Sequence, residues 1–280
     1  MNASIQTRYK LLSTITEFID LSPENPDHYI VEMDAPQIAA DCRPGQFIHA
    51  LPPKVELMLR RPFSLLTTDK NKGSISILFR VMGEGTQAMA DLQPGDKLDI
   101  IGPLGNGFPM DLTKPALIAG GGVGIPPLVY LAEKFIEAGY SPDNCFVFLG
   151  ARNTETMLCV ADFRSMGIEP YLASEDGSMG TKGFITHSLN EHRDKIPSGA
   201  VVYSCGPVPM LAAIAGWSGK NNLECYVSME NKLGCGIGAC LGCSIPVRHD
   251  DTIRYDRVCC DGPAFNSKDV AFDLIAKHHY

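Results

Sequence analysis

The chain has 280 residues, of which 45% are hydrophobic and 20% charged, and 24 basic against 32 acidic residues give a net charge of −8. This composition is typical of a globular protein and excludes global disorder, and the length allows two or three domains. Because the chain is acidic, we expect neither nucleic acid nor an anionic membrane as a partner. The longest uncharged stretch, residues 115–132, holds four glycines and three prolines, which argues against a membrane span.

The N-terminal region, residues 1–112, shows short β-rich runs separated by turns. The clearest run covers residues 74–81 (SISILFRV). Turn signals occur at residues 43–45 (RPG), 72–73 (KG) and 93–96 (QPGD). Many short strands at this spacing predict a small antiparallel β-barrel.

Two motifs in this region suit an anionic, planar cofactor. Residues 60–65 (RRPFSL) place an arginine beside a small hydroxyl, a pair that can hold a phosphate and hydrogen-bond a ring. Residues 78–86 (LFRVMGEGT) end a predicted strand in a glycine turn. Thr86 is expected to cap a helix there, and helix N-terminal amides can hold an anion. Taken singly, each motif has an equally good structural interpretation: a surface ion pair at Arg61 and a plain cap at Thr86.

The middle region, residues 113–226, alternates apolar strands with helices, which predicts a doubly wound parallel sheet. Strands are expected at residues 116–119, 145–149 and 200–204. A glycine-rich turn, GGGVG at residues 120–124, follows the first strand and opens a helix near Pro126. This is the context of a dinucleotide-binding turn, although the G-x-G-x-x-G fingerprint is absent.

A second turn, Cys205-Gly206-Pro207, follows the last of these strands. Its alternative interpretation is a buried cysteine before a helix that begins with proline. No acidic residue stands at a clear strand end about 20 positions after the glycines, whereas Arg152 is placed to meet a 2′-phosphate. From the residues alone, NAD and NADP therefore both remain open.

The C-terminal region, residues 227–280, holds the most specific motif. Five of the ten cysteines lie between residues 235 and 260. No secretory signal is visible, so we expect a reducing, cytoplasmic setting, where such a group of thiols favours metal or redox chemistry over disulfides. The C-x4-C-x2-C spacing of Cys235, Cys240 and Cys243, with a distant fourth cysteine at 259 or 260, is typical of plant-type [2Fe–2S] sites. A zinc site or a set of buried thiols is the alternative, but structural zinc usually takes two paired knuckles.

The sequence around these cysteines resembles a known family. Residues 227–243 (VSMENKLGCGIGACLGC) and 257–265 (RVCCDGPAF) are similar to the electron-transfer subunits of bacterial NAD-dependent dihydroorotate dehydrogenases. The resemblance covers most of the chain, and the earlier turns also resemble those of ferredoxin-reductase-like proteins. It implies FAD, a [2Fe–2S] cluster and NAD. We therefore expect an FAD-binding β-barrel domain at residues 1–112, an NAD-binding α/β domain at 113–226 and a small cluster domain at 227–280.

The resemblance also implies roles for single residues. The cluster ligands would be Cys235, Cys240, Cys243 and Cys259, the last because Cys259 begins a Cys-x-Asp-Gly-Pro run. FAD would bind with Arg61 near its phosphate, with Gly85 and Thr86 at its pyrophosphate, and along Pro62, Phe63, Ser64, Leu78, Phe79 and Arg80. NAD would bind at Gly120, Gly121, Gly122, Gly124, Gly206 and Pro207. Cys205 would lie near the nicotinamide ring, in a catalytic position.

These cofactors together predict an electron relay. A nicotinamide exchanges hydride, a [2Fe–2S] cluster takes one electron at a time, and a flavin does both, so the flavin belongs between them. The resemblance implies that an FMN-containing catalytic subunit oxidises dihydroorotate in pyrimidine biosynthesis and delivers the electrons, in a heterotetramer of two plus two chains. Nothing in the sequence resembles a catalytic barrel for that oxidation, so this chain alone should lack it.

Two other functions remain open. A flavin subunit of a ferredoxin–NAD(P) reductase or a sulfide dehydrogenase complex would use the same modules, although the cysteine set and the Asp-Gly-Pro run favour the dihydroorotate system. A non-catalytic, zinc-stabilised assembly subunit would account for the cysteines alone. The seven histidines show no ligand spacing with one another and are expected to be surface or ordinary polar residues.

Overall fold

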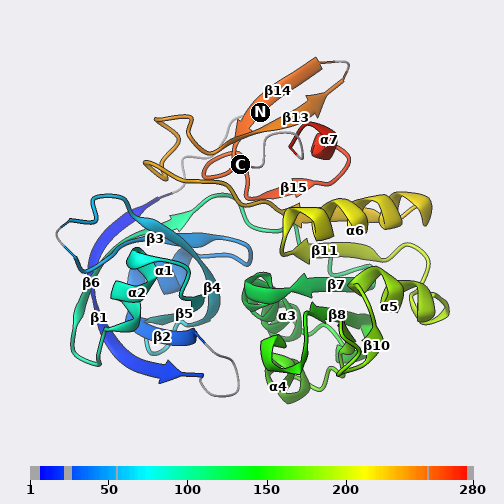
Figure 1. Ribbon diagram of the computed structural model, residues 1–280, viewed down its shortest axis with the longest axis horizontal. Helices are drawn as coiled ribbons and strands as arrows, with labels where there is room; N and C mark the ends of the chain where they lie inside the picture. Colours follow the sequence, from blue (N-terminus) through cyan, green and yellow to red (C-terminus); the bar gives the residue numbers. More distant parts are fainter. Residues whose placement is uncertain (1–6, 22–26, 55, 251, 276–280) are drawn as a thin grey trace.

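The computed structural model describes residues 7–21, 27–54, 56–250 and 252–275. Figure 1 shows a closed β-barrel beside a parallel sheet that is flanked by helices, with a C-terminal hairpin next to both. The fold class predicted from the sequence is therefore confirmed. In the described part of the chain, no helix combines the length and the apolar character that a membrane span requires.

The barrel consists of six antiparallel strands in the order β1-β2-β5-β4-β3-β6. The strands are β1 (Tyr9–Asp20), β2 (His28–Asp34), β3 (Phe47–Leu51), β4 (Arg61–Asp69), β5 (Ser74–Arg80) and β6 (Lys97–Leu104), with short helices α1 (Pro36–Asp41) and α2 (Glu84–Ala90). Side chains alternate between the two faces of a strand. On β3, Ile48 and Ala50 enter the barrel core, whereas Phe47 packs outward in a cluster with the C-terminal region. The outer wall of the barrel is therefore itself a packing surface.

The second sheet has seven strands in the order β10-β9-β8-β7-β11-β12-β15. They are β7 (Ala116–Gly121), β8 (Cys145–Ala151), β9 (Tyr171–Ser174), β10 (Thr181–Lys182), β11 (Val201–Cys205), β12 (Glu224–Ser228) and β15 (Ala264–Asn266). Its helices are α3 (Pro126–Glu137), α4 (Val160–Ser165), α5 (Ile185–Glu191) and α6 (Val208–Lys220), with single 3₁₀ turns at Gly122–Gly124, Pro142–Asn144, Thr154–Thr156 and Arg193–Lys195. All neighbouring strands in this sheet are parallel, except that β12 and β15 are antiparallel.

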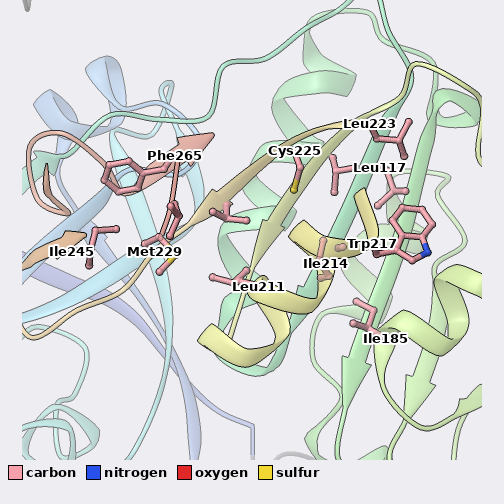
Figure 2. Packing of buried hydrophobic residues seen from close by; sticks show 14 of the residues in the cluster. Leu117, Ile185, Leu211, Ile214, Trp217, Leu223, Cys225, Met229, Ile245 and Phe265 are labelled. Atoms are coloured by element: carbon pink, nitrogen blue, oxygen red, sulfur yellow. The ribbon is translucent and has the colours of Figure 1, made fainter. Parts of the chain in front are cut away.

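Both faces of this sheet are covered, as expected for continuous apolar strands. On β7, Leu117 and Ala119 belong to the core cluster with α5 and α6, whereas Ala116 and Ile118 belong to the cluster with α3 and α4. Figure 2 shows the first of these clusters around Leu117 and Trp217. The sheet is therefore doubly wound, with its helices divided between the two faces.

The barrel and the sheet are joined by a buried tyrosine. Tyr130 of α3 has no exposed surface and belongs to the core cluster of the barrel. Its hydroxyl accepts a hydrogen bond from Thr68 Oγ1 at 3.3 Å and donates one to the Cys42 carbonyl at 3.3 Å. Because a buried hydroxyl without partners is unfavourable, these bonds favour one relative position of the two units.

The C-terminal region packs on both units. It contains the hairpin of β13 (Ser244–His249) and β14 (Thr252–Arg257) and the short helix α7 (Phe272–Ile275), while β15 returns to extend the parallel sheet. Its core is continuous with that of the sheet, and Figure 2 shows Met229, Ile245 and Phe265 in the same cluster. On the barrel side, Asn106 Nδ2 donates to the Cys260 and Asp261 carbonyls at 2.9 and 3.1 Å. The cysteine-bearing segments are thus held against the barrel.

Candidate functional site

A cavity of about 910 Å³ lies between the barrel, the sheet and the C-terminal region. From the barrel it is lined by Pro62, Phe63, Ser64, Leu78, Phe79 and Arg80. From the sheet it is lined by Gly121, Gly122, Gly124, Gly206 and Pro207. Residues Met229, Leu233 and Val258 of the C-terminal region complete the wall. The structure therefore brings two separately predicted motifs into one site, next to the cysteine-bearing segments.

The cavity lies at the topological switch point of the parallel sheet. After β7 the chain continues to β8 and β9 on one side, and it later returns to β11 on the other side. Gly120 at the end of β7 is the register partner of Cys205 at the end of β11. Ligands of open α/β sheets bind outside the carboxyl ends of strands at such a point. The two turns predicted to bind NAD are therefore neighbours in the position that favours a dinucleotide.

Close packing explains why Gly124 is a glycine. A Cβ atom on Gly124 would lie 2.5 Å from the backbone carbonyl of Cys205 and from the amide nitrogen of Gly206. The two turns therefore touch backbone to backbone, and a larger residue would push them apart. This contact couples the glycine-rich turn to the Cys-Gly-Pro turn in the wall of the cavity.

Arg61, Gly85 and Thr86 are not among the residues that line the cavity. They nevertheless lie together, because a Cβ atom on Gly85 would be 2.8 Å from Arg61 Nε. The expected cap at Thr86 is wrong: α2 begins at Glu84, with Gly83 as its N-cap. Thr86 instead lies inside the first turn, where its Oγ1 accepts hydrogen bonds from the amides of Met82 and Gly83 at 2.8 and 3.2 Å. Its hydroxyl therefore shapes the turn, and its proposed role at the pyrophosphate remains a prediction.

Arg80 is a half-buried cation in the barrel wall of the cavity. Its Nε atom is buried and has no hydrogen-bond partner in the described part of the chain. A buried guanidinium nitrogen needs an acceptor, and phosphate or a flavin carbonyl supplies one. The apolar walls, the size of the cavity and this nitrogen therefore fit the predicted FAD.

Gly120 and Cys205 are also not among the residues that line the cavity. Cys205 is 1% exposed, and burial raises the pKa of its thiol well above the usual range. The thiol is therefore neutral at pH 7. A role at the nicotinamide ring remains a prediction for Cys205.

Arg152, which the sequence offered as a contact for a 2′-phosphate, lines the cavity, and so do Glu175 and Glu230, which had not been predicted to bind a cofactor. Arg152 follows β8 and Glu175 follows β9, so both lie at carboxyl ends of parallel strands. Glu230 follows β12 and also lines the cavity. The residue is exposed, yet desolvation by the surrounding protein raises the pKa of its carboxyl group. A strand end is a signal for such residues, but β9 carries only four residues and was not recognised in the sequence.

The predicted cluster ligands form two pairs. Cys235 Sγ accepts hydrogen bonds from the Ile237 and Cys240 amides at 3.5 and 3.4 Å, and Cys240 Sγ accepts one from the Cys235 amide at 3.4 Å. Burial acts to raise the pKa of the Cys235 thiol, but these amides outweigh it and lower the value to about 6. This pair is therefore placed in a loop that stabilises thiolate.

The second pair is Cys243 and Cys259, whose sulfurs are 3.3 Å apart. Both are buried, and desolvation together with the neighbouring Cys243 raises the pKa of Cys259. Cys260 Sγ lies 3.8 Å from Cys259 Sγ, so both candidates for the fourth ligand are next to each other, and Cys259 in that role remains a prediction. In the described residues, no group of three or more potential ligands is close enough for a single metal ion. Two thiol pairs suit a cluster of two irons, each of which takes two thiolates.

Arg257 ties the two cysteine-bearing segments together. Its Nε and Nη2 atoms donate to the Asp261 carboxylate at 2.9 and 3.1 Å, and Nη1 donates to the Gly238 carbonyl at 3.0 Å. The Arg257 guanidinium in turn holds the pKa of Asp261 below its usual range. Arg257 lies in the conspicuous motif RVCCDGPAF, but the motif alone does not predict this role.

His49 on β3 lies under the cysteine loop. It has no exposed surface, and burial lowers the pKa of its imidazole to about 4. The ring is therefore neutral at pH 7. The histidines were expected to be surface or ordinary polar residues; His49 does not lie at the surface, because its strand faces another unit of the protein rather than solvent.

Three family models match the chain in consecutive segments. Residues 14–108 match an oxidoreductase FAD-binding domain, and residues 117–216 match an oxidoreductase NAD-binding domain. Residues 230–271 match the iron-sulfur cluster binding domain of dihydroorotate dehydrogenase B. The cofactor set predicted from the sequence, FAD, NAD and an iron–sulfur cluster, is therefore confirmed.

Curated relatives match over nearly their whole length. The electron transfer subunit of dihydroorotate dehydrogenase B (NAD(+)) from Desulforamulus reducens is 37% identical over 89% of this chain and 94% of its own. The subunit of the same name from Caldanaerobacter subterraneus subsp. tengcongensis is 43% identical over 82% and 87%. Among solved structures, a chain of an NADH-dependent reduced ferredoxin-NADP oxidoreductase has a TM-score of 0.83 at 25% identity, over 99% of this chain and 94% of that one. A ferredoxin reductase of carbazole 1,9a-dioxygenase, at 20% identity and a TM-score of 0.64 over 79% and 68%, shares the fold.

Proposed function

Because the chain belongs to the family of electron transfer subunits of dihydroorotate dehydrogenase B, we propose that it relays electrons from an FMN-containing, dihydroorotate-oxidising subunit to NAD. The order of carriers in the proposal is [2Fe–2S] cluster, FAD, NAD. When bound, FAD supplies the link, since a flavin exchanges single electrons with a cluster and hydride with a nicotinamide.

One observation carries this proposal: three units of the protein meet at one cavity. The flavin-motif residues Pro62–Ser64 and Leu78–Arg80 face the turns at Gly121–Gly124 and Gly206–Pro207 across it. Leu233 and Val258 bring the cysteine-bearing segments to the same wall. A binding protein for a single cofactor would not need all three walls, whereas a relay needs its carriers side by side.

In the proposal, the residues of the chain position the cofactors, donate hydrogen bonds to them and shield them from water. In the proposal, Arg80 and Arg61 hold the anionic part of FAD while Pro62, Phe63 and Leu78 exclude water from its ring. Gly121, Gly124 and Gly206 let the nicotinamide dinucleotide approach the backbone. Cys235, Cys240, Cys243 and Cys259 hold the cluster, and Arg257 keeps their two segments together.

The cluster loop also offers a surface for the catalytic partner. Ile237 is 45% exposed and Leu241 is 63% exposed, although both are apolar and flank the predicted ligands. Tyr255 on the neighbouring β14 is 68% exposed. Exposed apolar residues in the cluster domain favour a protein contact. We propose that this surface receives the partner, in a heterotetramer of two plus two chains that acts in pyrimidine biosynthesis. A cytoplasmic location is proposed because all ten cysteines are free thiols.

The likeness to the ferredoxin-NADP oxidoreductase chain supports a second candidate, in which a ferredoxin replaces the dihydroorotate-oxidising subunit. The family model of the cluster domain and the higher identity of the curated relatives favour the first candidate.

The proposal is tested with the purified chain, alone and with its native partner. Alone, the chain should reduce a dye with NADH and should not oxidise dihydroorotate. With the partner, dihydroorotate should reduce NAD, and reduced ferredoxin should not serve as the electron donor in place of dihydroorotate. Turnover of dihydroorotate by the chain alone would contradict the proposed division of labour, and ferredoxin-dependent reduction of NAD(P) would favour the second candidate.

A further inference from the structure

His49 is a fully buried polar residue without a partner. It has no exposed surface, and neither Nδ1 nor Nε2 has a hydrogen-bond partner within the described ranges. Backbone groups of Arg60 and Cys235 are near enough to influence the ring, yet neither completes a hydrogen bond. Burying an imidazole N–H without an acceptor is unfavourable, so the position needs a reason other than packing.

The ring lies between the flavin motif and the cluster loop. Along the barrel wall, His49 is the register partner of Pro62, which lines the cavity. On the other side, a Cβ atom on Gly236 would be only 2.5 Å from His49 Nδ1. Gly236 directly follows the predicted ligand Cys235 and has a φ of +71°, so glycine lets the loop turn tightly over the ring. His49 therefore touches both segments between which electrons must pass.

We propose that His49 is a positioning residue of the cluster site, which seats the Cys235–Gly236 segment on the flavin strand and donates its Nδ1–H to a sulfur of the bound cluster. The inference rests on the proposed function, because it requires the cluster in this loop. It assigns to the barrel, rather than to the cysteine domain, one of the hydrogen bonds that set the reduction potential. Hydrogen bonds to the sulfurs of a cluster stabilise the reduced, more negative form and raise its potential.

Two variants of the full-length holoprotein and one control test the donor. His49→Leu removes the donor and keeps an apolar side chain of similar size. His49→Asn restores an N–H near the position of Nδ1. Ile101→Ala is the packing control, because Ile101 is the register partner of His49 on β6 and carries no polar side-chain group. The readouts are iron and sulfide content, and the midpoint potential and g-values of the cluster from redox titration followed by electron paramagnetic resonance.

We expect His49→Leu to retain FAD and to shift the reduction equilibrium of the cluster about tenfold towards the oxidised form. For a one-electron couple, this shift lowers the midpoint potential by about 59 mV. His49→Asn should recover most of that shift, and Ile101→Ala should leave the potential unchanged. An unchanged potential in His49→Leu, or an equal shift in Ile101→Ala, would overturn the inference. If His49→Leu loses the cluster, His49→Asn decides: a wild-type potential and g-values support the inference, and a lost or shifted signal overturns it. Wild-type protein without iron and sulfide would contradict the proposed function as well.

Discussion

The substitution Gly124→Ala tests whether the two turns at the end of the parallel sheet form one nicotinamide site. The new methyl group would lie 2.5 Å from the backbone of Cys205 and Gly206, whereas ordinary contacts begin at 3.4 Å. The turns must therefore separate by about 0.9 Å, which is 3.4 minus 2.5. Neither partner is a flexible side chain, so the strain cannot be relieved by a rotamer change.

The expected magnitude follows from that displacement. Overpacking of this kind costs about 1–3 kcal/mol. A misplacement of about 1 Å between reacting groups slows a reaction by about 100-fold. FAD binding should not change, because the cavity residues predicted to contact the flavin come from the barrel. We therefore expect normal flavin content and a reduction of bound flavin by NADH that is roughly 10- to 100-fold slower.

Anaerobic stopped-flow absorbance at the flavin band measures this rate directly. Gly216→Ala is the matched control, because Gly216 lies in α6 and a Cβ atom there would meet nothing within 4 Å. The control should reduce its flavin at the wild-type rate. A wild-type rate in Gly124→Ala, or an equal loss in the control, would refute the assignment of the site.

Three further predictions concern the cluster and the nucleotide. Cys259→Ser should abolish or alter the cluster signal in electron paramagnetic resonance while Cys260→Ser leaves it intact, and the reverse result would reassign the fourth ligand. Arg257→Ala should weaken cluster retention about fivefold, since a partly exposed ion pair contributes about 1 kcal/mol. The rate of iron release to a chelator measures this retention. An equal effect of the exposed control Arg254→Ala would contradict the role of Arg257 in holding the two cysteine-bearing segments together. Glu175→Ala should raise the use of NADPH relative to NADH several-fold, because a carboxylate at a strand end selects the ribose 2′-hydroxyl; unchanged kcat/KM ratios would exclude it.

Much of the fold follows from local patterns in the sequence. The apolar runs at residues 116–119 and 145–149 became β7 and β8, because a buried parallel strand needs continuous apolar residues. The β-rich run at residues 74–81 likewise became a strand of the barrel, β5. What local patterns do not contain is pairing between distant segments. The three residues of β15 join β12 only because the C-terminal region returns to the sheet.

The same limit applies to the site. The glycine turns and the cysteine loop are local motifs, so they were visible in the sequence. Thr86 was assigned to the wrong position because the turn before it places Gly83 at the helix start. His49 carries no signal of its role, since its neighbour across the interface, Gly236, is 187 positions later in the sequence. The sequence boundaries at 112/113 and 226/227 remain predictions, and β12 crosses the second of them.

In the proposed relay, one chain passes electrons between NADH, FAD and a [2Fe–2S] cluster. The most direct measurement adds NADH to the anaerobically purified chain and records its low-temperature electron paramagnetic resonance spectrum. We predict the signal of a reduced [2Fe–2S] cluster, and its loss when FAD is removed before NADH is added. Bleaching of the flavin without any cluster signal, in protein that contains iron and sulfide, would contradict the relay.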